Sequence, residues 1–420
     1  MRLLYFIPRY AAGLMGNRIH SEVLELWRAQ GVEPEVVTLD AAVRGRQTED
    51  HDGIPIHRLP VSAGLPLKLA NRGLNLLLHY PYLAGAILHY RRLLRVHRYD
   101  LVHVETSFPL GLVAGLVPRR DSPLLAITLP GADIMAEPDY DYGYGRFPAV
   151  RALLPMIFRR ADLLRADSPQ IHTLALRLGA PADRMITVPY NITADSYPPA
   201  GVDLALFRAS CREEIQMRHA LDPRRPVIVS VNRLHPFKGF AYLIDAAAAL
   251  RAQGFDPQVL IVGPNRSTPR FGDYGEFLQR RAREQGVADA VVFVGAVEHA
   301  ETLRYMAAAD LAVVASVAES FSRVAIEAAA AGTPVVITRT TGASDYIVEH
   351  GCGLAVEPRD GLSLAQGCAR LLSDRALWQS CAERAVPMAA GFSSEAIAGR
   401  LLEAYRGLEP RTKNQEPQRR

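Results

Sequence analysis

The sequence has few cysteines, and none of them is placed to form a metal or disulfide framework. Its 420 residues include four cysteines, scattered without a Cys-x-x-Cys pair: Cys211, Cys352, Cys368 and Cys381. Zinc sites and disulfide scaffolds both use cysteines at short, regular spacings. We therefore expect neither, and a reducing cytoplasm is the simplest location for the chain.

Long apolar runs are also missing. No stretch approaches the roughly 20 apolar residues that cross a bilayer as a helix. The N-terminal MRLLYFIPRYAAG contains a short apolar run that Pro8 and Arg9 interrupt. This pattern predicts a first β-strand and not a signal peptide.

The chain has no large excess of charge of either sign. Its net charge of +4 is small for 420 residues, which argues against general nucleic-acid binding and against a strongly acidic partner. A content of 49% hydrophobic and 22% charged residues is typical of a soluble globular protein. The length is sufficient for two domains, each with a core of its own.

Short β-branched or leucine-rich runs alternate with helical patterns, which predicts parallel sheets with helices on both faces. The predicted strands form two series. The first series is RLLYFI, PEVVTL, DLVHVE, PLLAITL, ADLLRA and MITVPY; the second is PVIVSV, QVLIVG, AVVFVG, DLAVVAS, PVVIT and CGLAVE. Between them, residues 192–225 are rich in proline and mixed charge and suit a connection. We predict an α/β protein of two doubly wound domains with a cleft between them.

The predicted domains have definite limits. An N-terminal domain covers 1–195 and a C-terminal domain covers 196–392. A helix over 393–408 is expected to pack back on the N-terminal domain. The polar segment 409–420 has nothing to bury and is expected to be a disordered tail.

Parallel sheets bind ligands at the carboxyl ends of their strands, so the residues just after each strand are informative. After PVIVSV, the loop NRLHPFKG carries Arg233 and Lys238, and a helix begins after Gly239. Two cations beside a helix N-terminus suit a diphosphate. The alternative is a pair of ordinary surface cations. In the first half, YAAGLMG places Gly13 and Gly16 after the first strand, where glycine lets backbone approach a ligand.

A second informative place is the segment ESFSRVAIEAAAAGTPVV, residues 319–336. Ser322 is a suitable N-cap for a helix that is apolar on nearly every side. A buried carboxylate is costly unless it is paired or hydrogen-bonded, so Glu327 is expected to have a partner. In a purely structural interpretation this partner is a neighbouring arginine or backbone N–H groups. Glu319, at the strand end, is a second carboxylate in this mainly apolar segment.

Taken in order, these motifs resemble the retaining glycosyltransferases of family 4. SVNRLHPFKG matches the family's Arg-Leu and Lys-Gly signature, and ESFSRVAIEAAAAGTPVV matches its Glu-x-Phe-(Gly/Ser)-x-x-x-x-Glu and Gly-x-Pro-Val-Val pattern. The resemblance covers almost the whole chain and is densest over 226–360. It implies the GT-B architecture, two Rossmann-like domains facing across a cleft. It also implies sugar transfer from a nucleotide-diphosphate sugar to a glycan or lipid-linked acceptor.

The resemblance implies a role for each matching residue. Glu327 would bind the ribose hydroxyls and Glu319 the hydroxyls of the transferred sugar. Arg233 and Lys238 would bind the diphosphate and stabilise its charge as it leaves, so that neither metal nor cofactor is needed. The remaining implied contacts are Phe321, Ser322 and Gly16 to the donor sugar and phosphates, and Gly295 and Val297 to the base.

Two features depart from the family pattern. In TLPGADI, Pro130 stands where the family usually has histidine, which removes an imidazole and an N–H group near the donor sugar. In DYDYGYGR, Asp139 and Asp141 have the Asp-x-Asp spacing of metal-dependent glycosyltransferases, but they lie in a proline- and glycine-rich loop and not at a strand end. We expect this loop to contact the acceptor or to have no function. The candidate acceptor residues are Gly13, Asp133, Tyr140 and Tyr142.

Residues 81–98, PYLAGAILHYRRLLRVHR, combine apolar positions with four arginines. Such a helix can lie on an anionic membrane, which would suit a lipid-linked acceptor at the inner face of a membrane. The alternative is a helix packed on the sheet with its arginines outside. For the whole chain, two functions besides transfer are compatible with the motifs. One is a pseudo-enzyme that binds a nucleotide sugar without transferring it, and the other is a sugar-nucleotide epimerase.

Overall fold

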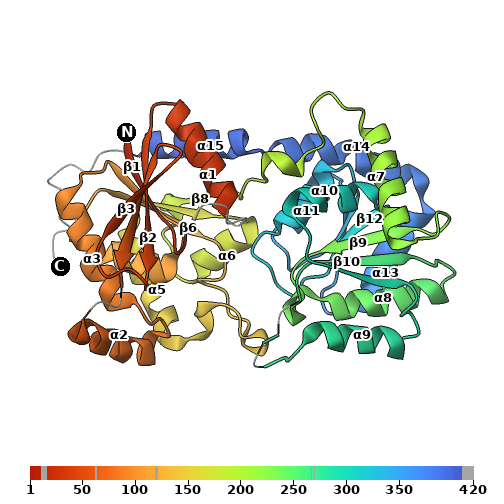
Figure 1. Ribbon diagram of the computed structural model, residues 1–420, viewed down its shortest axis with the longest axis horizontal. Coiled ribbons are helices and arrows are strands. Elements are labelled where there is room, and N and C mark those ends of the chain that lie inside the picture. The colour runs from red at the N-terminus through yellow and green to blue at the C-terminus, as the bar shows by residue number, and fades with distance from the viewer. Residues whose placement is uncertain (11–16, 62–63, 119–121, 266, 269, 409–420) are drawn as a thin grey trace. The chain divides into compact units, whose positions relative to one another are not determined.

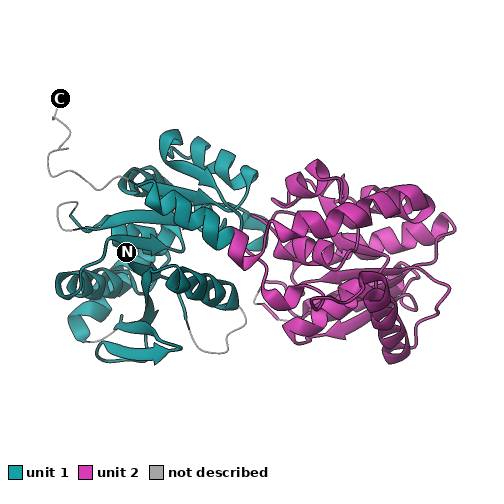
Figure 2. Ribbon diagram, turned by 90° about the horizontal axis from the view of Figure 1, so that it is seen from above, with its two compact units in different colours: residues 1–189, 397–420 teal, residues 190–396 magenta. Residues whose placement is uncertain are grey.

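The computed structural model describes residues 1–10, 17–61, 64–118, 122–265, 267–268 and 270–408. They form two compact units, residues up to 189 with 397–408 and residues 190–396 (Figures 1 and 2). Within the described residues, no helix is both long enough and apolar enough to cross a membrane. Gly13, Gly16 and the predicted tail 409–420 lie outside the described residues.

The first unit is built on an eight-stranded sheet with the order β3-β4-β2-β1-β5-β6-β7-β8. All neighbours are parallel except β3 and β4. The strands are β1 Arg2–Phe6, β2 Glu33–Asp40, β3 Gln47–His51, β4 Ile54–Pro60, β5 Leu101–Val104, β6 Leu124–Leu129, β7 Leu163–Ala166 and β8 Met185–Thr187. The helices are α1 Arg18–Ala29, α2 Leu65–Leu78, α3 Leu83–Val96, α4 Leu112–Gly115, α5 Pro148–Arg160, α6 Pro169–Arg177 and α15 Ser394–Arg406.

The second unit is built on a six-stranded parallel sheet with the order β11-β10-β9-β12-β13-β14, the Rossmann order. Its strands are β9 Val227–Val231, β10 Gln258–Val262, β11 Val291–Gly295, β12 Leu311–Val314, β13 Val335–Thr338 and β14 Gly353–Val356. Its helices are α7 Leu204–His219, α8 Phe240–Ala252, α9 Tyr274–Glu284, α10 His299–Ala308, α11 Arg323–Ala330, α12 Ser344–Glu349, α13 Gly361–Ser373 and α14 Arg375–Ala390.

Each predicted strand run is confirmed. The runs could be recognised because parallel strands that are covered on both faces consist mainly of apolar residues. All four residues of β12, for example, are buried. Two strands of the first sheet were not predicted. β3, QTEDH, is a polar edge strand, and β4, IPIHRLP, contains two prolines and a central His-Arg pair that hide its alternation. β3 is held by antiparallel pairing with β4, and β4 is held by parallel pairing with β2.

The segment 192–225, predicted to suit a connection between the domains, contains a helix that the sequence did not predict. Residues 204–219 form α7, and its Cys211 and Ile215 are buried in the core of the second unit. Arg208 fixes the helix further by donating to the carbonyls of Ala331 (2.9 Å) and Ala309 (2.8 Å). The helix was not predicted because many of its residues are polar or charged and only a narrow face of it is buried.

The units also divide six residues earlier than the predicted limit of 195. Residues from Tyr190 onward belong to the second unit, where the Ile192 amide donates to the Phe392 carbonyl at 2.9 Å. The chain returns to the first unit at Ile397, within α15. There the Trp27 indole donates to the Ala398 carbonyl at 2.9 Å, and Tyr405 bonds the buried His103 of β5.

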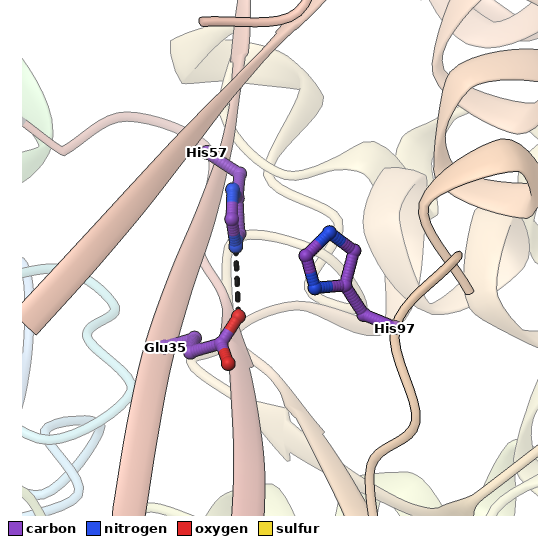
Figure 3. Close-up of side chains that lie close together, drawn as sticks. All are labelled: Glu35, His57 and His97. Carbon is purple, nitrogen blue, oxygen red and sulfur yellow. Dashed lines mark hydrogen bonds and ion pairs between the residues drawn. The ribbon is translucent and has the colours of Figure 1, made fainter. Parts of the chain in front are cut away.

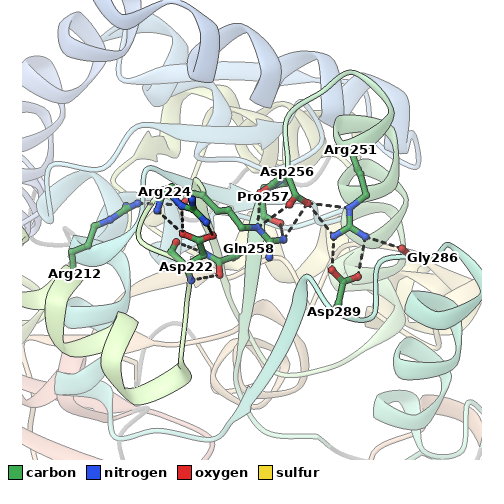
Figure 4. Close-up of polar contacts among 10 residues, drawn as sticks. Arg212, Asp222, Arg224, Arg251, Asp256, Pro257, Gln258, Gly286 and Asp289 are labelled. Atoms are coloured by element: carbon green, nitrogen blue, oxygen red, sulfur yellow. Dashed lines mark hydrogen bonds and ion pairs between the residues drawn. The ribbon is translucent and has the colours of Figure 1, made fainter.

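One group of ion pairs in the second unit lies before the strands begin (Figure 4). Arg251, at the end of α8, bonds Asp289 at 2.8 Å ahead of β11 and Asp256 at 3.0 Å ahead of β10. The Gln258 side chain bonds both backbone groups of Asp222. These contacts hold the amino edge of the sheet, and the carboxyl edge carries a different set of residues.

Candidate functional site

Two loops meet at the carboxyl edge of the second sheet. The loop after β9 ends at Gly239, whose φ is +73°, and a Cβ there would lie 1.9 Å from the Ala315 carbonyl oxygen after β12. The Val317 amide donates to the Phe237 carbonyl at 2.8 Å. Only glycine permits this approach. The contact brings Lys238 to the turn that contains Glu319.

Lys238 and Glu319 form a buried ion pair with Nζ 2.6 Å from Oε1. The second carboxylate oxygen accepts a hydrogen bond from Ser316 Oγ at 2.8 Å. The side chains are only 7% and 15% exposed. Burial lowers the pKa of Lys238, and the nearby Glu319 opposes this shift. The sequence predicts separate roles for the two residues, whereas in the structure they form one ion pair.

Arg233 lies on the same loop and is exposed. Its guanidinium group is 5.9 Å from the centre of the Phe237 ring. Within the part of the chain that the structure describes, it has no ion pair. The loop therefore presents one cation that is paired and buried beside another that is available to an anion.

The start of α11 differs from the prediction that Ser322 caps the helix. Ser322 occupies the N-cap position, but its φ of +80° is left-handed and its side chain makes no capping bond. Its buried Oγ has no hydrogen-bond partner among the described residues. The Phe321 carbonyl accepts from the Ala343 amide at 2.7 Å, but neither the Phe321 nor the Ser322 amide donates to a described residue. Strain, an orphaned hydroxyl and open amides at one turn point to a ligand.

Glu327, in the middle of α11, is 5% exposed. The sequence predicts a partner for its carboxylate, and the purely structural alternative, an arginine or backbone N–H groups, is not found among the described residues. No described residue hydrogen-bonds the carboxylate, and the nearest cation-forming group is the imidazole of His299, with Nε2 4.0 Å from Oε1. A buried carboxylate without hydrogen bonds is unfavourable unless a bound group completes it.

His299 is a further residue of the site that the sequence did not predict. It begins α10, and its Nε2 lies 3.2 Å from Thr193 Oγ1 and 3.3 Å from Ser196 Oγ. The predicted base-contact residues Gly295 and Val297 immediately precede it. Gly295 has a φ of +85° and open space where a Cβ would lie. Their spacing along the chain was the available signal, because α10 starts two residues after Val297.

The predicted acceptor residues that the structure describes belong to the first unit. Asp133 follows β6 and is 1% exposed. Its Oδ2 accepts from the Ser107 amide at 2.7 Å and from Ser107 Oγ at 2.6 Å, whereas Oδ1 has no partner among the described residues. Burial raises the pKa of Asp133 to about 6, although the bonds from Ser107 oppose this. Tyr140 and Tyr142 are half-buried.

The loop that holds these tyrosines is tied down by its backbone. Glu137 and Tyr142 exchange two hydrogen bonds of 2.9 and 3.1 Å. A Cβ at Gly143 would lie 2.0 Å from the Met135 carbonyl oxygen. Asp139 and Asp141 are exposed and belong to no cluster of three potential ligands among the described residues.

The described residues include one group of three side chains whose potential ligand atoms lie within 4.8 Å of one another: Glu35, His57 and His97 (Figure 3). Glu35 is already engaged, with His57 Nε2 at 2.8 Å and Arg2 at 3.0 Å. Arg46 lies 3.3 Å from Nε2 of His97. Two guanidinium groups at the ligand atoms oppose a divalent cation. We therefore interpret the group as a polar network of the first sheet.

Two family models match most of the chain. The family described as Glycosyl transferases group 1 matches residues 212–386, and the Glycosyl transferase 4-like domain matches residues 16–191. A D-inositol 3-phosphate glycosyltransferase from Nocardia farcinica is 34% identical over 59% of this chain, and the match spans 53% of that relative. D-inositol 3-phosphate glycosyltransferase 1 from Catenulispora acidiphila is 31% identical, with 73% of this chain and 72% of the relative covered.

Among solved structures, Alr3699/HepE from Anabaena in complex with UDP has the same fold. Its TM-score is 0.72 at 20% identity, and the match covers 97% of this chain and all of that chain. The predicted fold class, GT-B with two Rossmann-like units, is confirmed.

Asp133 provides a pH test of its buried environment. Its folded pKa of about 6 is above the ordinary value of 3.8, so the stability contributed by the protonated form is present below pH 4 and is lost as the pH rises through 6. Asp133→Asn stays neutral. We expect its unfolding free energy, relative to wild type, to increase by up to about 3 kcal/mol between pH 4 and 7.5 in urea titrations. A difference that does not change with pH would contradict this.

Proposed function

Because this chain belongs to the glycosyl transferases of group 1, we propose that it moves a sugar from a nucleotide-diphosphate sugar to a glycan or lipid-linked acceptor, with retention and without a metal. The observation that carries the proposal is the Glu327 carboxylate, which is buried and accepts no hydrogen bond from a described residue. It is a ready acceptor for a ligand with two neighbouring hydroxyl groups.

Glu327 takes the ribose in this proposal. A carboxylate has two acceptor oxygens, and a vicinal diol has two donors at matching spacing. The diol supplies the hydrogen bonds that the protein does not. His299, 4.0 Å away, is the nearest side chain that could add a charge-assisted contact. The base then lies toward Gly295 and Val297, whose backbone precedes His299.

The diphosphate lies between the loop after β9 and the start of α11. Arg233 supplies an unpaired guanidinium group, and the amides of Phe321 and Ser322 supply donors at a helix N-terminus. Lys238 supplies a second positive charge, held by Glu319. These groups stabilise the diphosphate most as it leaves, because negative charge develops on it at that step.

Glu319 has a double role. It holds the ammonium group of Lys238, and its remaining lone pairs accept hydroxyl groups of the donor sugar. The bond from the anomeric carbon to the phosphate oxygen breaks, and a bond to the acceptor oxygen forms on the same face. The acceptor's proton passes to an oxygen of the leaving diphosphate. We assign Asp133, Tyr140 and Tyr142 to the acceptor side.

We place the enzyme in the cytoplasm. The four thiols are buried and unpaired, which suits a reducing compartment.

Transfer should proceed at full rate in excess EDTA. Arg233, Lys238 and the α11 amides supply the positive field that a divalent ion supplies in metal-dependent enzymes. The measurement is product formation with and without chelator, with added manganese as the second arm. Loss of activity in EDTA that manganese restores would contradict the mechanism.

The product should keep the anomeric configuration of the donor, because attack and departure occur on one face of the sugar. Proton NMR of the new linkage reports the configuration through its anomeric coupling. An inverted product would overturn the same-face mechanism.

Substitutions of the two glutamates should have different effects on ligand binding measured by calorimetry. Glu327→Ala should weaken nucleoside diphosphate and nucleotide sugar alike, by about 1.5 to 3 kcal/mol, because both carry ribose. Glu319→Gln should leave diphosphate binding nearly unchanged while it weakens the nucleotide sugar and lowers turnover. Glutamine is used at 319 because its amide oxygen can still accept a hydrogen bond from the buried Lys238 ammonium, which alanine cannot do.

Glu327→Gln is the matched control, since it keeps the side-chain shape and tests the charge alone. Each variant must first show a cooperative thermal transition. Equal losses for both ligands in both variants would mean that the carboxylates support only the fold.

A further inference from the structure

Helix α2 exposes an unusual amount of apolar surface. Its sequence LPLKLANRGLNLLL contains seven leucines in 14 residues, yet its buried residues are only Asn71 and Leu78. The exposed leucines are Leu65 (69%), Leu69 (60%), Leu76 (79%) and Leu77 (61%). Leu65, Leu69 and Leu76 follow the i, i+4, i+11 spacing and form one stripe. Contiguous exposed apolar surface of this kind marks an interaction site.

The neighbouring helix α3 has the opposite character. Most of its apolar side chains are buried, among them Leu83, Ala86, Tyr90, Leu93 and Leu94, whereas Leu88 and Val96 are exposed. Its outer face presents Arg91, Arg92 and Arg95, all exposed. The sequence of 81–98 predicts either a membrane contact or a helix packed on the sheet with its arginines outside. The structure instead divides the two requirements, with apolar surface on α2 and positive charge on α3.

The two helices enclose a groove that combines both properties. It has a volume of about 460 Å³ and is lined by Leu74, Ala84, Ile87, Leu88 and three arginines, Arg91, Arg92 and Arg95. A smaller hollow of about 200 Å³ continues past the same helix, where Arg91, Arg95 and Arg98 meet Val117 and Pro118. A positively charged groove with an apolar floor suits an acyl chain beneath an anionic headgroup.

The charge of the segment is entirely of one sign. Residues 65–98 contain no aspartate or glutamate. They contain six cations: Lys68, Arg72, Arg91, Arg92, Arg95 and Arg98. The chain as a whole has a net charge of only +4. A leucine stripe within a purely positive surface is complementary to an anionic bilayer.

A polar anchor fixes α2 with this face outward. Asn71 Nδ2 donates to the Val61 carbonyl at 2.7 Å, and Asn71 Oδ1 accepts from the Ala84 amide at 2.9 Å. These bonds join the middle of α2 to the end of β4 and to the start of α3. The helix therefore lies at the carboxyl edge of the first sheet, the edge at which parallel sheets bind ligands.

We propose that the outer face of α2 and α3 docks this protein on an anionic lipid bilayer. The leucines of α2 enter the headgroup–acyl boundary, and the arginines of α3 contact lipid phosphates. The contact is peripheral and needs no spanning helix. It does not depend on the proposed glycosyl transfer, because binding to lipid involves neither donor nor acceptor.

Vesicle sedimentation tests the proposal with the full chain and no donor present. Wild type should bind vesicles of phosphatidylglycerol and phosphatidylcholine but not vesicles of phosphatidylcholine alone. Raising the salt from 0.05 to 0.5 M should weaken binding, since salt screens the arginines. The triple variants Leu65→Gln/Leu69→Gln/Leu76→Gln and Arg91→Gln/Arg92→Gln/Arg95→Gln should each lower vesicle affinity about tenfold or more.

The matched control is Leu206→Gln/Met217→Gln/Leu362→Gln in the second unit, where these side chains are 71%, 72% and 66% exposed. It should bind as wild type does. The proposal is overturned if wild type does not bind anionic vesicles, or if the α2 variant binds them unchanged. It is also overturned if wild type dimerises in sedimentation velocity through the α2 leucines and does not bind vesicles, because the occupant is then a second copy.

Discussion

The buried ion pair between Lys238 and Glu319 determines the arrangement of the carboxyl edge of the second sheet. It joins the loop after β9 to the turn after β12, and both loops can approach only because residue 239 is glycine. An ammonium group removed from water is costly, and the opposite charge at 2.6 Å compensates it. The pair holds one cation in place, while Arg233 beside it stays available.

The two edges of the second sheet differ in whether their polar side chains have partners within the protein. At the amino edge, Arg251, Asp256 and Asp289 satisfy one another, so each contributes modestly to stability. At the carboxyl edge, the buried Ser322 hydroxyl has no hydrogen-bond partner among the described residues, and Glu327, 5% exposed, has only the His299 imidazole at 4.0 Å as a described ion-pair partner. Unsatisfied polar groups destabilise a fold, and they are retained where a ligand completes them. The first unit shows a similar feature in the partnerless Oδ1 of Asp133.

The sequence predicted the parts of the fold that depend on local pattern. Apolar strand runs were recognisable because both faces of each strand are buried. β3 and β4 were missed because edge position and prolines remove that pattern, and α7 was missed because its buried face is only Cys211 and Ile215. The split at 189/190 depends on tertiary contacts of Tyr190–Ser196 that no local pattern records.

The candidate site was predictable in residue identity and less so in its interactions. Arg233, Lys238, Glu319 and Glu327 came from their spacing after strands and from the family resemblance. The Lys238–Glu319 pair could not be predicted, because it depends on the approach of two loops 81 residues apart. Serine is a common helix N-cap, but the backbone of Ser322 is left-handed and its side chain makes no capping bond. His299 could be identified only from its distance to Glu327 in the folded structure.

The central claim is that the carboxylate of Glu327 is reserved for a ribose diol. The most direct measurement compares a ribonucleoside diphosphate with its 2′,3′-dideoxy analogue by calorimetry, in wild type and in Glu327→Gln. We expect wild type to bind the dideoxy analogue about ten- to hundredfold more weakly, because the carboxylate is again left without donors, and we expect the variant to lose most of this discrimination. Equal affinity of wild type for the two nucleotides would contradict the account.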